Sequence, residues 1–248
     1  HGGSLHYRWA SPAGAVFLGA ERALHSIGTG LIFVCNYERQ AYAAKLGLGG
    51  KPNVVVYNGL LPEEFTDVPA LPDAADLLFI GDMRRLKGVD VLLEAIAKLN
   101  ATQPVTACLV GDGPDLNAFK ALAAKLGLET RVTFPGRMAA RAAFQRGRLL
   151  VMPSRAESFP YVVIEATAAG IPMIASAVGG IPEVLPPALL VPPGDAHALA
   201  GRLQGALSDQ PRLLEAAAAT RARLKRDFTV AAMARHITDF YATLRSAR

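Results

Sequence analysis

The chain has 248 residues, of which 51% are hydrophobic and 19% are charged, and its net charge is +5. This composition predicts a folded protein with a substantial core and excludes an intrinsically disordered chain. No run of about 18 apolar residues is free of charge, so no membrane-spanning helix is expected, and the basic residues are too dispersed to indicate nucleic-acid binding.

Short apolar segments alternate with longer helical patterns, which predicts βα units and an α/β fold with a doubly wound parallel sheet. Most apolar segments are continuous, as expected for strands covered by helices on both faces of their sheet. Strands are predicted at residues 31–35, 54–57, 77–80, 105–110, 132–134, 149–152, 173–175 and 189–191. Helices are predicted at residues 89–99, 116–126, 140–146, 162–169, 195–207, 212–226 and 229–244.

Residues 67–73 (DVPALPD) show the one clear shift in composition, and their two prolines indicate a linker. We interpret this linker as the hinge between a first, partial unit and the main doubly wound domain. The expected domains are residues 1–66, 67–227 and 228–248. Asp195 and Thr229 are the expected N-caps of the helices that follow them.

The segment richest in candidate functional residues is 153–166. A buried strand ends there, a polar loop follows, and a helix begins near Pro160, with Ser158 suited to the N-cap. Such a helix start favours a phosphate, because its free N–H groups and its dipole attract anions. Glu157 and Glu165 have carboxylates that suit the paired hydroxyls of a ribose or sugar. Spacing alone equally allows Glu157 to compensate the helix dipole and Glu165 to face solvent.

A second cluster, residues 79–90, also places polar residues after a strand and before a helix. Lys87 could act there as a point charge on a diphosphate, although a surface lysine in a turn is the alternative.

Residues 111–114 (GDGP) begin like a dinucleotide fingerprint but lack its third glycine, so we interpret them as a tight turn. No P-loop, nucleophile elbow or zinc-ligand pattern occurs, which leaves NAD binding, triad hydrolysis and zinc catalysis without support.

The two cysteines, Cys35 and Cys108, each lie inside an apolar run and are expected to be buried. Their spacing matches no metal site, and a reducing compartment is their simplest context. A cytoplasmic location is therefore expected.

Taken together, these segments resemble glycosyltransferase family 4, the retaining group 1 transferases, over residues 35–241. The signature is Glu157-x7-Glu165, with Ser154 before it and AGIP (169–172) and VGGIPE (178–183) after it. Further matching segments are VYNG (56–59), LFIG (78–81), KGVD (87–90), LVGDGP (109–114) and VTFPG (132–136). Each segment alone is a weak signal, but their order and spacing together are specific.

The resemblance implies a GT-B fold, in which two Rossmann-like domains face a cleft and the C-terminal one holds a nucleotide sugar. We expect this chain to contain that Rossmann-like C-terminal half and, in residues 1–66, a remnant of the N-terminal acceptor domain. The helix at 229–244 would cross back and pack on this remnant. By this expectation the chain is a fragment of a two-domain enzyme.

By the same resemblance, Lys87 would neutralise the leaving diphosphate, Glu157 would bind the transferred sugar and Glu165 the ribose hydroxyls. His1 resembles the histidine at the edge of the acceptor domain that touches the donor sugar. The other expected donor-binding residues lie in three loops and are Gly81, Arg84, Arg85, Gly136, Arg137, Met138, Ser158, Phe159, Pro160 and Tyr161. The loop at 136–138 would hold the base, and backbone N–H groups near 159 and 161 would contact the sugar and phosphate.

Two residues in these loops depart from the family pattern. Asp82 stands where an arginine is common, which leaves Arg84 or Arg85 to supply that cation. Pro160 replaces a glycine and removes one N–H donor.

The implied activity is that of a retaining hexosyltransferase, which moves a sugar from a nucleotide-diphosphate sugar to a hydroxyl of a glycan or lipid acceptor. No cofactor and no obligatory metal is expected. The process would be cell-envelope or polysaccharide biosynthesis in the cytoplasm, with peripheral contact to the inner face of the membrane through the missing domain. Two alternatives stay open, a nucleotide-sugar-binding module without turnover and another GT-B enzyme such as a nucleotide-sugar epimerase. The Glu157-x7-Glu165 context argues against the epimerase.

Overall fold

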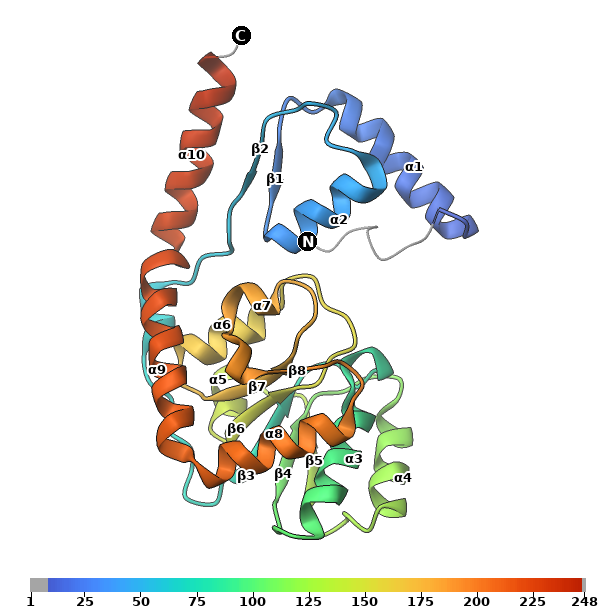
Figure 1. The fold of residues 1–248 in the computed structure, drawn as a ribbon, viewed down its shortest axis with the longest axis vertical. Coiled ribbons are helices and arrows are strands. Elements are labelled where there is room, and N and C mark those ends of the chain that lie inside the picture. Colours follow the sequence, from blue (N-terminus) through green and yellow to red (C-terminus); the bar gives the residue numbers. More distant parts are fainter. Residues whose placement is uncertain (1–8, 247–248) are drawn as a thin grey trace.

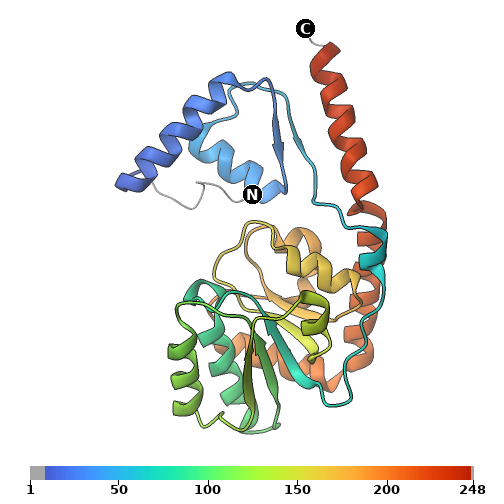
Figure 2. The same cartoon turned by 180° about the vertical axis from the view of Figure 1, so that it is seen from behind.

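The computed structural model describes residues 9–246 and consists of a small upper unit and a larger lower domain (Figure 1). Helix α10 (Val230–Ser246) rises from the lower domain along the upper unit, and Figure 2 shows the same arrangement from behind. No helix within 9–246 combines the length and apolar character needed to cross a membrane. His1 lies outside the described residues, so its expected sugar contact stays a prediction.

The lower domain is built on a six-stranded sheet in which every strand pair is parallel. The strands are β3 (Ala75–Ile80), β4 (Ala107–Val110), β5 (Val132–Gly136), β6 (Gly147–Met152), β7 (Met173–Ser176) and β8 (Leu190–Val191). Their spatial order is β5-β4-β3-β6-β7-β8. Counted from β3, this is the 3-2-1-4-5-6 order of dinucleotide-binding Rossmann sheets. The predicted doubly wound sheet is confirmed, with strand ends that differ from the prediction by one or two residues.

Helices cover both faces of this sheet, which explains why its strands are apolar throughout. They are α3 (Val89–Asn100), α4 (Leu116–Lys125), α5 (Ala140–Phe144), α6 (Tyr161–Ala168), α7 (Ile181–Val184), α8 (Ala196–Ser208) and α9 (Gln210–Asp227). Helix α3 packs against α8, and α6 packs against α9. Leu77, Leu78 and Phe79 of the central strand have no exposed surface, so the core lies at the middle of the sheet.

Two of the three predicted N-caps are found. The Asp195 carboxylate accepts hydrogen bonds from two backbone N–H groups of α8, and the Thr229 hydroxyl accepts one from α10. The prediction for Ser158 is wrong, because α6 begins at Tyr161 and its N-cap is Pro160, which has an extended backbone and makes no side-chain cap. The carbonyl oxygen of Ser158 instead accepts a hydrogen bond from the N–H of Gly180.

The upper unit contains two helices and two parallel strands. They are α1 (Pro12–Ile27), β1 (Leu31–Phe33), α2 (Asn36–Leu46) and β2 (Asn53–Val55). Helix α10 packs closely on this unit, so that a Cβ on Gly30 would lie 2.9 Å from the ring of Phe240. That this unit is the remnant of an acceptor domain stays a prediction.

The segment 67–73 does not form the predicted hinge. Val68 and Leu71 donate backbone hydrogen bonds to Ala169 and Gln145, so the segment is held against the lower domain. The chain passes between the units just before Leu60, which forms an isolated parallel bridge with Thr229 at the second crossing. The domain limits at 66 and 227 stay predictions.

Candidate functional site

The strand order creates a crevice at the carboxyl edge of the sheet. Strands β3 and β6 are parallel neighbours, and the chain leaves them toward opposite sides of the sheet. Such a reversal point is where open α/β sheets bind ligands. The loop after β3 ends in a 3-10 turn at Arg85–Lys87, and the loop after β6 runs to the start of α6. The two richest segments of the sequence therefore face each other.

Lys87 and Glu157 meet between these loops. The Lys87 Nζ lies 2.7 Å from Oε1 and 2.9 Å from Oε2 of Glu157. The Ser154 hydroxyl donates to the same Oε1 at 2.7 Å. Glu157 is 8% exposed and Lys87 25%, so the pair is largely shielded from water but open on the lysine side. Because an ammonium group has three N–H donors, Lys87 keeps donor capacity for a bound anion.

The close approach of the two loops depends on glycine at position 88. Gly88 has φ of +70°, in the left-handed region that side chains disfavour. A Cβ at this position would lie 2.0 Å from the carbonyl oxygen of Pro153 in the facing loop. Any other residue would push the loops apart and separate Lys87 from Glu157.

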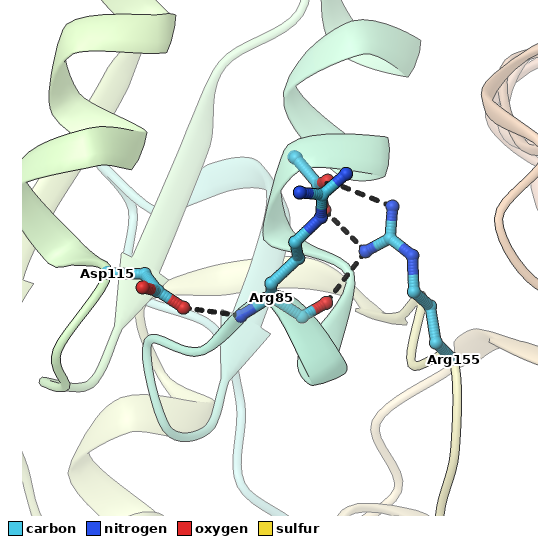
Figure 3. A network of polar contacts seen from close by, with 4 residues as sticks. Arg85, Asp115 and Arg155 are labelled. Carbon is cyan, nitrogen blue, oxygen red and sulfur yellow. Dashed lines mark hydrogen bonds and ion pairs between the residues drawn. The ribbon is translucent and has the colours of Figure 1, made fainter.

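An ion-pair network also joins the loop after β3 to the loop after β6 (Figure 3). The Arg155 guanidinium donates to both carboxylate oxygens of Asp90, at 2.7 and 2.9 Å, and to the carbonyl oxygen of Arg85 at 2.7 Å. The hydrogen bonds to Asp90 raise the pKa of Arg155. Asp115 accepts the backbone N–H of Arg85 at 2.8 Å. These contacts fix the 3-10 turn that carries Lys87.

The structure distinguishes the two arginines that stand in for the family cation. Arg85 Nε lies 3.8 Å from Asp90, and its side chain points toward this carboxylate (Figure 3). Arg84 precedes the 3-10 turn and its side chain is exposed. Both side chains are exposed, and what separates the two arginines is that Arg85 lies near the Asp90 carboxylate.

The loop at 136–138 and the segment just before α6 hold the remaining candidate residues. Gly136 ends β5, and Arg137 beside it lies 4.0 Å from Asp112, with both side chains largely exposed. The ring of Phe159 is buried and lies tilted beside that of Tyr57, at 5.8 Å between centroids. Only the backbone of Phe159 is thus available to a ligand.

Glu165 lies in the second turn of α6 and is partly buried. Burial raises the pKa of its carboxyl, and the charge of Glu64 raises it further. The neighbour that perturbs Glu165 is thus on the segment 62–65, whereas Glu157 is bound by Lys87. The expected sharing of one ligand by both carboxylates stays a prediction.

Sequence reasoning left Ser154, Asp90 and Arg155 out of the site. Ser154 and Arg155 stand three and two residues before Glu157, and Asp90 stands three after Lys87. Ser154 and Asp90 belong to the segments that resemble the family, and their proximity to Glu157 and Lys87 was the available signal. Their partners could not be named without the fold.

Comparisons with known proteins show the family of this chain. The family model described as "Glycosyl transferases group 1" matches residues 62–225, which include the whole crevice. The chain belongs to this family. This group 1 glycosyltransferase chain is 32% identical over 162 residues to the phosphatidylinositol N-acetylglucosaminyltransferase gpi3 subunit of Schizosaccharomyces pombe. It is 35% identical over 180 residues to the D-inositol 3-phosphate glycosyltransferase of Mycobacterium avium.

Solved structures resemble the glycosyltransferase chain over nearly its whole length. Sucrose-phosphate synthase from Thermosynechococcus elongatus has a TM-score of 0.82 and 28% identity, covering 99% of this chain and 66% of its own. Anabaena Alr3699/HepE in complex with UDP has a TM-score of 0.83 and 22% identity, covering 94% and 70%. The match to the Schizosaccharomyces pombe relative covers 63% of this chain and 36% of the relative, and the match to the Mycobacterium avium relative covers 66% and 42%. The chain thus spans less than half of either relative.

Proposed function

We propose that this chain forms the donor-binding half of a retaining glycosyltransferase, which moves a sugar from a nucleotide-diphosphate sugar to an acceptor hydroxyl. The observation that carries the proposal is the Lys87–Glu157 pair at the reversal point of the sheet. A cation and a shielded carboxylate, placed where Rossmann sheets hold nucleotides, suit a diphosphate and a sugar hydroxyl respectively.

Each part of the donor has a proposed partner in the crevice. The diphosphate lies near Lys87, Arg84 and the N–H groups at the start of α6, where the helix dipole favours anions. Glu157 accepts hydrogen bonds from the transferred sugar, and Glu165 accepts them from the ribose. The loop at 136–138 holds the base.

The proposed reaction keeps the configuration at the sugar carbon. The bond from the anomeric carbon to the diphosphate oxygen breaks, and its electron pair stays on the diphosphate. The acceptor oxygen bonds to the same face of the anomeric carbon, and its proton passes to the departing phosphate oxygen. Lys87 and Arg84 stabilise the charge that develops on the diphosphate, and no metal is required in this proposal. Removal of one such donor typically costs about 3 kcal/mol, or roughly a hundredfold in rate.

A module that binds the nucleotide sugar without turning it over is the second candidate. The chain spans 36% of the Schizosaccharomyces pombe relative, and the two-stranded sheet of the upper unit is far smaller than that of the lower domain. Acceptor binding would then depend on residues outside this chain.

The acceptor is proposed to be a glycan or a lipid, used in cell-envelope or polysaccharide biosynthesis at the cytoplasmic side of a membrane. The names of the two relatives contain phosphatidylinositol and inositol 3-phosphate, both of which carry hydroxyl groups. Co-sedimentation of the chain with anionic and neutral lipid vesicles tests the peripheral membrane contact.

Isothermal titration with UDP, GDP and ADP tests donor binding, beginning with UDP because the HepE structure is a UDP complex. Binding of at least one nucleotide is expected, and it should weaken in Lys87→Met, which removes the cation proposed to contact the diphosphate. Absence of binding by all three would refute the donor site. An assay of sugar release and transfer, run with and without a chelator, then separates the enzyme from the module. Proton NMR of the released sugar reports whether its configuration is retained.

A further inference from the structure

The Glu183 carboxylate joins the lower domain to the upper unit. Glu183 lies on α7, and its oxygens accept hydrogen bonds from the backbone N–H groups of Asn36 and Tyr37, at 2.9 and 2.8 Å. The Asn36 side-chain amide donates to it at 3.0 Å and the Tyr57 hydroxyl at 2.9 Å. Four donors from the upper unit and the crossing segment thus converge on one carboxylate of the lower domain.

These donors include the start of α2, which is 11 residues long. The first N–H groups of a helix have no partner within it, and the helix dipole favours an anion beside them. Glu183 supplies that anion from across the boundary between the units. Burial alone would raise the pKa of Glu183, but the hydrogen bonds outweigh burial and the pKa is lowered. The contact is therefore made by an ionised group.

The turn before α7 contacts the loop between β6 and α6, which carries Glu157 and is called the donor loop below. The Gly180 N–H donates to the carbonyl oxygen of Ser158 at 2.6 Å. Gly179 has φ of +58°, and a Cβ there would lie 2.1 Å from the carbonyl oxygen of Glu157. Movement of α7 would thus be transmitted to the backbone that carries Glu157.

Helix α7 is fixed to the lower domain from its other side. The Arg223 guanidinium on α9 donates to the carbonyl oxygens of Glu183 and Val184, both at 2.6 Å. Tyr57, which reaches Glu183 from the crossing segment, also stacks on Phe228 at 4.6 Å between ring centroids. The Glu183 contact therefore lies beside both crossings of the chain, where the relative placement of the two units is set.

We propose that Glu183 is a positioning residue that latches the upper unit to the donor loop, so that nucleotide binding near Glu157 and the placement of α2 are coupled. The inference rests on the proposed function for its ligand. It goes beyond that function because it assigns Glu183 a role in coupling the lower domain to the upper unit. Because such coupling is reciprocal, a nucleotide bound at the loop must also stabilise the contact at α2.

Hydrogen exchange of the whole chain, read by mass spectrometry with and without UDP, tests the latch. In Glu183→Gln, the amides of Asn36 and Tyr37 are expected to exchange about tenfold faster, because their bonds to a charged acceptor are weakened. UDP is expected to slow exchange of these amides in the natural chain and to have little effect on them in Glu183→Gln. The matched control is Glu129→Gln, which makes the same change at an exposed position and should leave both results unaltered.

Two further measurements keep the outcomes separate. Tyr57→Phe removes one donor to Glu183 and is expected to give a smaller effect of the same kind, which serves if Glu183→Gln does not fold. If none of UDP, GDP and ADP binds the natural chain, the donor-site proposal fails, and exchange without nucleotide still reports on the latch. Unchanged exchange at Asn36 and Tyr37 in folded Glu183→Gln would overturn the latch. UDP protection of these amides that is equal in both chains would overturn the coupling.

Discussion

Replacing Lys87 with methionine removes the cation and keeps most of the apolar stem. Glu157, 8% exposed, would then lose its ion partner and keep the hydroxyl of Ser154 as a donor. Removing one partner of a buried ion pair costs about 3–5 kcal/mol. Because Lys87 is 25% exposed and the Ser154 hydroxyl remains, we expect Lys87→Met to lower the free energy of unfolding by about 2 kcal/mol. For a chain of this size this corresponds to a melting temperature lowered by roughly 4–8 °C.

A double-mutant cycle with Glu157→Gln isolates the pair. Lys87→Met combined with Glu157→Gln leaves no unpaired charge, so the double variant is expected to be more stable than the sum of the single losses predicts, by about 1–2 kcal/mol. Calorimetric unfolding provides the free energies. Lys98→Met is the matched control, because Lys98 is exposed on α3 and its loss should change stability little. Strictly additive losses would show that Lys87 and Glu157 do not interact in solution.

The same variant tests the proposed phosphate contact. A hydrogen bond to a charged group contributes about 1.5–3 kcal/mol, so Lys87→Met is expected to weaken UDP binding roughly 10- to 100-fold. Isothermal titration measures this change, again against Lys98→Met. An unchanged UDP affinity would refute the phosphate contact even if the ion pair is real.

Three other changes have expected outcomes. Gly88→Ala should lose about 2 kcal/mol more stability than Gly127→Ala in calorimetric unfolding. Both glycines have φ near +70°, but of the two only Gly88 has a backbone carbonyl in the way of a Cβ. Equal losses of stability would contradict the close approach of the two loops. Glu165→Gln should raise the melting temperature at pH 7, because burial, and then a neighbouring carboxylate, raises the carboxyl pKa. The ionised form thus lowers stability at neutral pH, and the gain should vanish as the pH falls below the raised pKa, where Glu165 is protonated in the natural chain. A gain that persists in acid would point to another cause. Arg155→Gln should weaken UDP binding several-fold, because it loosens the 3-10 turn that carries Lys87. Adding Asp90→Asn should weaken UDP binding little more, since both residues belong to one network. Additive effects of the two changes in isothermal titration would argue against the network.

Much of the secondary structure of the lower domain was predictable because it depends on patterns of neighbouring residues. Continuous apolar strands, helical periodicity and residues such as Asp195 determine elements over a few positions. The N-cap of α6 was missed because Ser158 has the right side chain, yet its carbonyl is engaged by Gly180, 22 residues away in sequence. A hinge was predicted at 67–73 because its prolines indicate an irregular segment, but prolines do not show which surface holds that segment.

The amino-acid sequence was sufficient to predict the alternating strands and helices, the resemblance to the family and the loops that carry Lys87 and Glu157. The fold was needed to show that Lys87 binds Glu157 directly, 70 residues away, and that Arg85 is turned toward Asp90. It also brought Glu183 to the start of α2, across 147 residues. Such contacts follow from the order of the strands in the sheet and from the two chain crossings. No local pattern encodes that order, because each strand is equally apolar and could pair with several others.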